Sequence, residues 1–476
     1  MKNPGTIQFL LNGSPVQIDF HNSPHLSPTT TLLQYLRTSP ELTGTKEGCA
    51  EGDCGACTIV MVAPGLDNQH LVKAVDSCLI FLPMIHRKAI FTVEYLGAKD
   101  LHPVQGAMVK FDGSQCGYCT PGFIMSMYAL HQNHQNPSRE TIMDALTGNL
   151  CRCTGYQSIL TAAFHAGKGT NDDEVIKQAC QQINQWPQSS LSIVTGSQKY
   201  FQPINLTELL KLRSMYPHAI LIHGATDIAL KVTKNHEWLD QIIDLSQVSE
   251  LSQVQEGEEK TSFGAGLCLE EVKQLSKDLF PALHDCLEVF GSLQIRNLAT
   301  LGGNIASASP IGDTLPVLMA YGATVTLANT HGQREIPVTD FITGYRETCL
   351  EDDEILVNIS IPSAHKNHLV KWYKISKRKD LDISSVSGGF FLSLDQNQVQ
   401  NIKLYYGGLA AQTKLASNTV DFLINQPWTR ETIRAATPLL EKDFIPISDA
   451  RADAESRMIM AKNLLLKLWS ETSAEN

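Results

Sequence analysis

Short apolar and alternating runs fill the first ninety positions and predict a small mixed sheet. Thr6–Leu11 alternates well enough for a strand, Asn12-Gly13 favours a tight hairpin turn, and Val16–Phe20 returns as the partner strand. Further strands are predicted at Thr58–Val62, Leu71–Ala74 and Ala89–Val93. Helical spacing is found in Thr31–Arg37, so we expect one helix to cross this sheet.

The next segment has a helical pattern. Phe123–His131 forms one helix in this prediction, with Thr120 as its N-cap and Pro121 at its first position. A second helix is expected from Asn136-Pro137 to Leu146, and a last one ends near Ala166. The stretch that follows, Gly167–Ser192, is polar and rich in Gln, Asn and Ser, which is typical of a linker.

After this stretch the pattern changes to strand-like runs separated by glycine-containing turns. The predicted strands are Ala219–Ile222, Ile242–Leu245, Thr324–Leu327, Ile355–Ile361, Lys371–Lys374, Gly389–Leu394 and Ile402–Tyr406. A helical tail at Ala454–Leu468 completes the pattern. The order of elements therefore predicts an α+β protein of several domains.

A group of cysteines interrupts the first predicted sheet. The residues concerned are Cys49, Cys54, Cys57 and Cys78. Their Cys-x4-Cys-x2-Cys spacing with a distant fourth member is that of a plant-type [2Fe–2S] cluster. Gly48, Gly52 and Gly55 lie between the ligands, where residues without a Cβ let the backbone wrap closely around the sulfides. The alternatives are a disulfide pair or a zinc site, and structural zinc usually shows two Cys-x2-Cys pairs.

A second group of four cysteines lies in the helical segment. Its members are Cys116, Cys119, Cys151 and Cys153. Cys-x-Cys is unusual for structural zinc, which prefers two to four intervening residues. Two loops at helix ends could face each other and present two thiolates each, which favours a second cluster.

Charge and cysteine usage narrow the class of protein. The formal net charge is -11, so a nucleic-acid partner is not expected. The N-terminus lacks the apolar region of a secretory signal, and apolar runs such as Leu79–Ile85 are too short to cross a membrane. Twelve cysteines without a signal indicate a reducing cytoplasm with metal ligands. The remaining cysteines, interpreted as buried small residues or free thiols, are Cys180, Cys268, Cys286 and Cys349.

Two glycine-containing loops stand out after the predicted linker. One is Leu221–Ile228 and the other is Ala299–Pro310, continued by Ile311–Asp313. Neither has the Gly-x-Gly-x-x-Gly pattern, so a Rossmann nucleotide site is not predicted. Hydroxyl groups and backbone N–H groups in such loops suit a pyrophosphate, and tight turns without a ligand are the alternative.

Four motifs in this order carry a resemblance to a known family. GTKEGCAEGDCGACT, QCGYCTPGF, GNLCRCTGY and LGGNIASASPIGD resemble those of the small iron–sulfur and flavin subunit of bacterial xanthine dehydrogenases, within the molybdenum hydroxylases. The resemblance runs over roughly residues 5–470. It implies a β-grasp [2Fe–2S] ferredoxin domain, a four-helix [2Fe–2S] domain, a vanillyl-alcohol-oxidase-type FAD domain and a C-terminal α+β domain. The expected boundaries are 1–90, 91–166, 193–364 and 365–476, with 167–192 as the linker.

The resemblance also implies the roles of individual residues. One [2Fe–2S] cluster takes the first group of cysteines and another takes the second group. The implied FAD positions are Leu221, Ile222, His223, Gly224, Ala225, Thr226, Asp227, Ile228, Phe290, Thr300, Leu301, Gly302, Gly303, Asn304, Asp313, Leu356 and Lys374. No side chain is implied as a catalytic acid or base. Glu347 stands where animal relatives carry a lysine, and His223 where an apolar residue is commoner.

The implied function is electron transfer. A molybdopterin-binding large subunit would oxidise hypoxanthine or xanthine to urate, and electrons would pass through two clusters to FAD and on to NAD+. FAD is needed because it accepts single electrons and releases a pair as hydride. We expect a cytoplasmic heterotetramer of two small and two large chains. The alternatives are the same role for aldehydes or other N-heterocycles, a stand-alone NADH:acceptor reductase, and a non-enzymatic assembly module.

Overall fold

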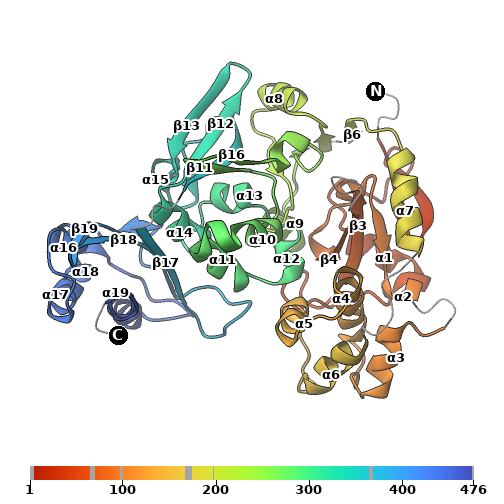
Figure 1. The fold of residues 1–476 in the computed structure, drawn as a ribbon. Coiled ribbons are helices and arrows are strands. Elements are labelled where there is room, and N and C mark those ends of the chain that lie inside the picture. Colours follow the sequence, from red (N-terminus) through yellow and green to blue (C-terminus); the bar gives the residue numbers. More distant parts are fainter. Residues whose placement is uncertain are drawn as a thin grey trace. The chain divides into compact units, whose positions relative to one another are not determined.

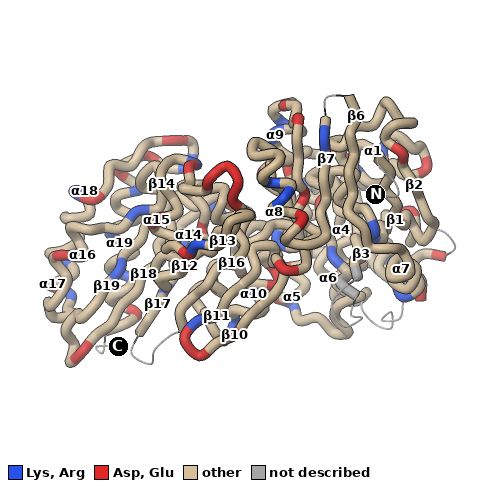
Figure 2. Tube along the Cα trace, turned by 90° about the horizontal axis from the view of Figure 1, so that it is seen from above, with Lys and Arg blue, Asp and Glu red and all other residues tan. Residues whose placement is uncertain are grey.

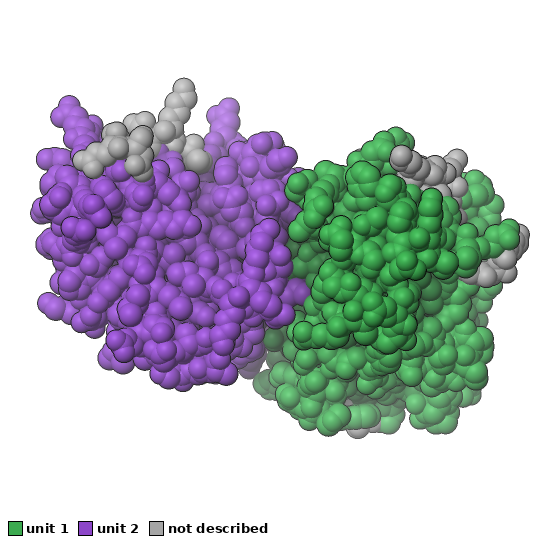
Figure 3. Space-filling model, turned by 90° about the horizontal axis from the view of Figure 1, so that it is seen from below, with its two compact units in different colours: residues 1–212, 216–249, 291–299 green, residues 213–215, 250–290, 300–476 purple. Residues whose placement is uncertain are grey.

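The computed structural model describes residues 5–64, 70–96, 100–166, 174–196, 198–363 and 368–473. The chain divides into two compact units, coloured in Figure 3. Unit 1 comprises residues 1–212, 216–249 and 291–299, and unit 2 comprises residues 213–215, 250–290 and 300–476. Figure 1 labels their helices and strands. In the described ranges, no helix combines the length and apolar character needed to traverse a bilayer.

Unit 1 begins with a five-stranded mixed sheet in the order β2-β1-β5-β3-β4. The strands are β1 (Thr6–Leu11), β2 (Ser14–Asp19), β3 (Thr58–Pro64), β4 (His70–Asp76) and β5 (Ala89–Phe91). The predicted hairpin is confirmed: β1 and β2 are antiparallel, and Asn12 and Gly13 both have the positive φ that a type I′ turn requires. β1 also pairs in parallel with β5, which makes the sheet mixed.

A helix follows this sheet where the sequence predicts one. α1 (Leu32–Thr38) begins after Thr31, whose hydroxyl accepts the Gln34 N–H while the Gln34 side chain accepts the Thr31 N–H. This capping box fixes the start of the helix, and its buried face consists of Leu32, Leu33 and Leu36. Three short 3₁₀ turns complete this part: η1 (Pro40–Leu42), η3 (Ser77–Leu79) and η4 (Leu82–Ile85).

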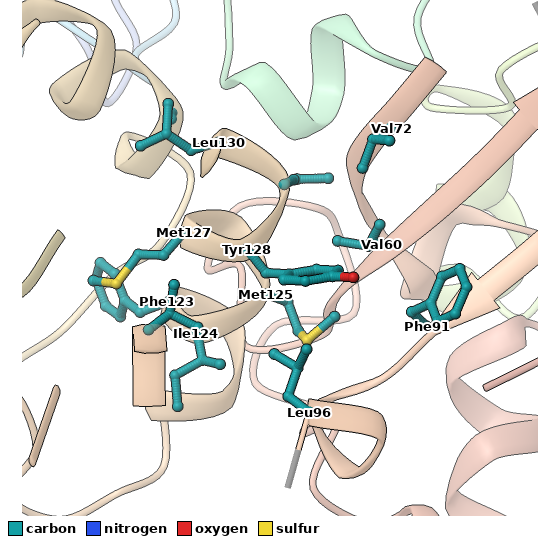
Figure 4. Packing of buried hydrophobic residues seen from close by; sticks show 14 of the residues in the cluster. Val60, Val72, Phe91, Leu96, Phe123, Ile124, Met125, Met127, Tyr128 and Leu130 are labelled. Atoms are coloured by element: carbon teal, nitrogen blue, oxygen red, sulfur yellow. The ribbon is translucent and has the colours of Figure 1, made fainter. Parts of the chain in front are cut away.

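A group of helices packs on one side of β3 and β4. It consists of α2 (Val93–Leu96), α3 (Pro103–Lys110), α4 (Thr120–Asn133), α5 (Arg139–Leu146) and α6 (Gln157–Ala166). Ten consecutive residues of α4, from Gly122 to His131, are buried, and Tyr128 reaches toward Val60 of β3 (Figure 4). The predicted N-cap of α4 is one residue late: Cys119 occupies the cap, and Thr120 is already helical.

The predicted linker contains a helix. Residues 167–173 lie outside the described residues, but α7 (Glu174–Gln185) occupies the middle of the stretch. Its buried residues are Ile176, Ala179, Cys180 and Ile183, at helical spacing. The linker prediction was wrong for this segment because the many Gln and Asn residues form the solvent face, and the few apolar residues between them suffice for packing.

Unit 1 continues with a second sheet, in the order β6-β7-β9-β8. Its strands are β6 (Leu191–Thr195), β7 (Gln198–Gln202), β8 (Ile220–Ile222) and β9 (Gln241–Asp244). The associated helices are α8 (Leu206–Met215), α9 (Ile228–Thr233) and α12 (Leu293–Arg296). β8 and β9 run parallel, so α9 forms part of a β–α–β crossover that begins at the loop after Ile222.

Unit 2 contains a five-stranded sheet in the order β10-β11-β16-β12-β13. Its strands are β10 (Val254–Glu256), β11 (Lys260–Gly264), β12 (Thr324–Asn329), β13 (Gly332–Pro337) and β16 (Ile355–Pro362). The helices are α10 (Leu269–Leu279), α11 (Pro281–Glu288), α13 (Leu301–Ala306), α14 (Thr314–Tyr321) and α15 (Val338–Phe341). The strands β14 (Ile342–Gly344) and β15 (Glu347–Thr348) form a separate hairpin.

A four-stranded antiparallel sheet, β17-β18-β19-β20, completes unit 2. Its strands are β17 (His368–Ile375), β18 (Val386–Asp395), β19 (Gln398–Gly407) and β20 (Lys414–Leu415). The C-terminal helices are α16 (Ser417–Leu423), α17 (Arg430–Ala436), α18 (Leu440–Asp443) and α19 (Ala454–Thr472). Figure 2 shows basic and acidic residues spread over the traces of both units.

Candidate functional site

The first group of cysteines is arranged as two pairs in unit 1. Cys57 Sγ lies 3.4 Å from Cys78 Sγ, and a hydrogen bond from the Cys54 thiol lowers the pKa of Cys49 to about 5. All are free cysteines, so the disulfide alternative does not apply to this arrangement. Two thiolates on one tetrahedral metal, each bonded at about 2.3 Å, lie about 3.8 Å apart. Each pair is therefore spaced for a shared metal ion.

The backbone of the Cys49–Cys57 loop has the conformation that its glycines predict. Gly52 and Gly55 have φ of +76° and +66°, in the left-handed region. A Cβ on Gly48 would lie 2.7 Å from Cys54 Sγ, so only glycine fits beside that sulfur. The backbone N–H groups of Glu51 and Asp53 each point at Cys49 Sγ at 3.4 Å. Such N–H groups stabilise negative charge on a cluster thiolate.

The second group also forms two pairs in unit 1. Cys116 shares a hydrogen bond with Cys153, which raises the pKa of Cys153, and Cys119 lies beside Cys151. Burial, and then the neighbouring Cys151 thiol, raise the pKa of Cys119 to about 12. Cys116 and Cys153 are exposed, whereas Cys151 is buried. The loop before α4, with Cys116 and Cys119, thus faces the loop after α5, with Cys151 and Cys153. Each pair consists of one cysteine from each loop.

This two-plus-two arrangement fits a two-iron cluster. A [2Fe–2S] rhomb needs two thiolates at each iron, and both groups supply them as adjacent pairs. In the part of the chain that the structure describes, no three His, Cys, Asp or Glu side chains are grouped for a single metal ion. A mononuclear zinc site would instead require three or four of these thiolates around one ion.

The two cysteine loops contact each other directly through their backbones. The Leu150 N–H donates to the Cys54 carbonyl at 3.0 Å, and the Tyr118 hydroxyl donates to the Glu47 carbonyl. A Cβ on Gly55 would lie 2.3 Å from the Gly148 carbonyl oxygen. Because Leu150 precedes Cys151, one hydrogen bond and a few covalent bonds separate a ligand of the first group from a ligand of the second.

Buried polar side chains hold this contact together, and sequence reasoning missed them. Asn149 Nδ2 donates to the Gly55 carbonyl at 3.0 Å and lies 3.1 Å from Thr58 Oγ1. Its Oδ1 accepts the Ser126 hydroxyl at 2.7 Å and Gln294 Nε2 at 3.1 Å. Asn149 stands next to a predicted ligand loop, but nothing in the pattern indicates Gln294 as its partner, 145 positions away.

Residues 291–299 come from the predicted flavin region and belong to unit 1, together with both groups of cysteines. Arg296 is fully buried and binds both carboxylate oxygens of Asp144 at 2.8 Å. Asn297 Nδ2 donates to the Ala74 carbonyl at 2.9 Å. These contacts fix the segment immediately before Thr300, the first residue of the second predicted flavin loop.

Removal of the Asp144 carboxylate should strongly destabilise unit 1. Asp144→Ala takes the bidentate partner from a buried guanidinium, and we expect a loss of about 3 kcal/mol in the free energy of unfolding. Denaturant unfolding of equally loaded protein measures this loss. Glu237→Ala is the matched control, because the Lys231–Glu237 pair of the same unit is exposed and should cost under about 1 kcal/mol. Equal losses in the two variants would contradict this role of Arg296.

The first predicted flavin loop, Leu221–Ile228, lies in unit 1 between β8 and α9. A Cβ on Gly224 would lie 1.7 Å from the Leu298 carbonyl oxygen, so this position excludes every residue but glycine. Ala225 has a positive φ of 56°. Thr226 and His223 are half-buried and Asp227 is exposed. The loop is therefore tightly turned and still presents polar groups at its surface.

The second predicted flavin loop, Thr300–Asn304, lies in unit 2. Thr300 caps α13 by accepting the Gly303 N–H, and Asn304 Oδ1 accepts the Thr314 hydroxyl. A Cβ on Gly302 would lie 2.6 Å from both the Cβ and the carbonyl oxygen of Ala265. Gly303 is exposed, so its backbone is accessible to a ligand. Small residues thus bring the main chain to the surface, as a pyrophosphate site requires.

Two further predicted flavin residues of unit 2 form one buried ion pair. Lys374 Nζ lies 2.9 Å from Asp313 Oδ2, and both side chains are less than one tenth exposed. The Ser384 hydroxyl donates to the other oxygen of Asp313. Leu356 is buried in β16, and Phe290 is half-buried just after α11. The structure thus brings Asp313 and Lys374 together, whereas Leu356 is also an ordinary core residue of its sheet.

Three protein families match successive parts of the chain. The "[2Fe-2S] binding domain" matches residues 92–164, the "FAD binding domain in molybdopterin dehydrogenase" residues 194–364, and the "CO dehydrogenase flavoprotein C-terminal domain" residues 371–472. Among solved structures, carbon monoxide dehydrogenase from Hydrogenophaga pseudoflava aligns with a TM-score of 0.55 at 21% identity, over 58% of this chain and 96% of that chain. Quinoline 2-oxidoreductase from Pseudomonas putida 86 gives 0.54 at 24% identity, with the same coverages. These structures share the fold.

Curated relatives extend the similarity over almost the whole chain. Xanthine dehydrogenase of Drosophila subobscura is 35% identical over 98% of this chain and 39% of its own length. The xanthine dehydrogenase/oxidase of Gallus gallus is 32% identical over 92% of this chain and 38% of its own. The chain thus spans about two fifths of the length of these relatives. With its [2Fe–2S] and FAD-binding domains, it belongs to the molybdenum hydroxylases, a family of oxidoreductases, as an iron–sulfur and flavin component.

Proposed function

We propose that this chain carries electrons from a molybdenum centre through two [2Fe–2S] clusters to FAD and on to NAD+, during oxidation of hypoxanthine and xanthine to urate. Cys49, Cys54, Cys57 and Cys78 would hold one cluster. Cys116, Cys119, Cys151 and Cys153 would hold the other. The observation that carries the proposal is the hydrogen bond of 3.0 Å from the Leu150 N–H to the Cys54 carbonyl, which joins the two ligand loops.

Contacts inside unit 1 support an order for the proposed cofactors. The second group of cysteines includes the exposed Cys116 and Cys153, which suits an electron entry point. The first group lies beside a flavin loop: α9, which follows that loop, packs against η3, and η3 contains Cys78. Electrons would therefore enter at the second cluster, cross the Leu150–Cys54 contact and leave from the first cluster toward FAD.

FAD supplies the change from single electrons to a hydride that NAD+ accepts. The side chains of this chain then have binding and orienting roles. Gly224 and Gly302 permit close approach of the backbone, and Gly303 offers an accessible one. The buried pair Asp313–Lys374 would fix β17 to the N-terminal end of α14 in unit 2 without itself transferring a proton.

The molybdenum centre would belong to a molybdopterin-binding partner, in a cytoplasmic heterotetramer of two chains of each kind. The matching family of FAD-binding domains is described as one of molybdopterin dehydrogenases, which supports a molybdopterin-binding component in the complex. Substrate choice would reside in that component. Assays of the complex with xanthine, an aldehyde and an N-heterocycle such as quinoline separate the proposed substrate from its alternatives, because only a purine should be turned over efficiently.

Cofactor content is the first measurement that tests the proposal. Eight cysteines in two-plus-two pairs should hold about four irons and four acid-labile sulfides for each chain. Elemental analysis and sulfide determination on protein purified without oxygen give both numbers. Zinc in place of iron, or half of the expected iron in fully loaded protein, would contradict the ligand assignment.

A further inference from the structure

A lysine of the flavin region contacts the loop of the first cysteine group. Lys234 is the C-cap of α9, and its Nζ donates to the Cys49 carbonyl at 3.1 Å. The same Nζ lies 3.2 Å from the Glu51 carboxylate. All three residues belong to unit 1. Lys234 thus places a positive charge on the backbone of a proposed cluster ligand, next to a carboxylate of opposite charge.

The local charges make this lysine important for a redox centre. The charged residues between Cys49 and Cys54 are acidic, Glu51 and Asp53. Reduction adds one electron to a [2Fe–2S] cluster and therefore one unit of negative charge inside this loop. A nearby cation stabilises the reduced form more than the oxidised form, and a nearby carboxylate does the opposite.

We propose that Lys234 and Glu51 together set the reduction potential of the cluster held by the first cysteine group, Lys234 raising it and Glu51 lowering it. The inference rests on the proposed ligand set. Lys234 caps α9, the short helix that follows the first predicted flavin loop. The positive charge that would stabilise the reduced cluster therefore comes from an element next to that loop. Lys234 would therefore act on the cluster through its charge, without direct contact with a proposed redox cofactor.

The test is a redox titration of the full complex with dithionite and mediators, followed by the paramagnetic signals of the two reduced clusters. Lys234→Met should shift the midpoint potential of the first cluster to lower values, and Glu51→Gln should shift it to higher values. The double variant should fall between them. Lys234→Arg keeps the positive charge and should stay near the parent protein. The signal of the second cluster should not move in any variant, which provides an internal reference.

Lys231→Met is the matched control. Lys231 lies in the same helix, is 44% exposed like Lys234, and pairs at 3.9 Å with Glu237, which does not belong to the cluster loop. Lys231→Met should leave the midpoint potentials of both clusters unchanged. Equal potentials in Lys234→Met and Lys231→Met would overturn the inference. If Lys234→Met does not retain the first cluster, Glu51→Gln provides the test. An unchanged or lowered midpoint potential of the first cluster in Glu51→Gln would overturn the inference. Absence of a first-cluster signal in the parent protein would instead contradict the proposed function.

Discussion

Cys153→Ser should abolish xanthine-dependent reduction of NAD+ while leaving NADH oxidation by an artificial dye largely intact. Cys153 is paired with Cys116, so the substitution would remove one of the two thiolates proposed to bind one iron of the second cluster. In the proposed route, electrons from xanthine would have to cross that cluster, whereas hydride from NADH would enter at FAD directly. Both activities are measured on the complex with its molybdopterin partner, after assembly and FAD content have been verified.

Two spectroscopic results accompany this activity test. The reduced parent protein should show two distinguishable paramagnetic signals, and Cys153→Ser should alter one of them and leave the signal of the first cysteine group. Cys349→Ser is the control, because Cys349 is a free cysteine outside both groups and should change neither signal nor activity. Surviving xanthine:NAD+ turnover in the Cys153 variant would show another electron path. Xanthine oxidation by the chain without its partner would refute the division of labour.

Substitution of Gly55, where the two cysteine loops contact each other, should have the second-largest effect on stability and electron transfer. Gly55→Ala combines a strained φ of +66° with a Cβ only 2.3 Å from the Gly148 carbonyl oxygen. A left-handed conformation costs a non-glycine residue about 1–2 kcal/mol, and overpacking costs about 1–3 kcal/mol more. The loops would have to separate, which lengthens the Leu150–Cys54 hydrogen bond. We expect lower stability, partial loss of clusters and slower electron transfer between them.

Substitutions of two other glycines distinguish backbone strain from steric overlap. Gly155 has almost the same φ, +68°, with no atom within 4 Å of an added Cβ, so Gly155→Ala measures strain alone. A Cβ on Gly122 in α4 would lie 2.2 Å from the Gly55 carbonyl oxygen, so Gly122→Ala measures overlap at a helical position. Denaturation at equal iron content and rapid-reaction reduction of the first cluster are the measurements. If Gly155→Ala slows this reduction as much as Gly122→Ala does, the loop contact is not part of the electron path.

Local patterns determined most of the secondary structure because the decisive interactions are short in range. The Asn12-Gly13 turn, the Thr31 cap and the alternation in β1 lie within a few residues of the elements they specify. The predicted strands of the flavin region and the C-terminal region are also present. One exception is α7, where the four buried apolar residues lie among many amides and form a weak pattern; these residues are buried by packing against the rest of unit 1.

The ligand candidates were also accessible to sequence reasoning, since thiolates in glycine-rich loops at fixed spacing are chemically distinctive. Their pairing was not, because Cys116 and Cys153 are far apart in the chain and meet only when α4 and the loop after α5 are in place. The FAD residues depended on resemblance for the same reason: the ion pair of Asp313 with Lys374 spans 61 positions.

The sequence by itself therefore determined the fold class and indicated the candidate cysteine ligands, because these depend on periodicity, turn chemistry and local spacing. The tertiary structure alone decided which thiols are paired, that Leu150 bonds to Cys54, and that Gln294 and Lys234 reach the cysteine loops. The three hydrogen bonds made by Leu150, Gln294 and Lys234 join residues 96 to 185 positions apart. Chain folding brings such residues together only as a consequence of many packed elements, so no local pattern specifies them.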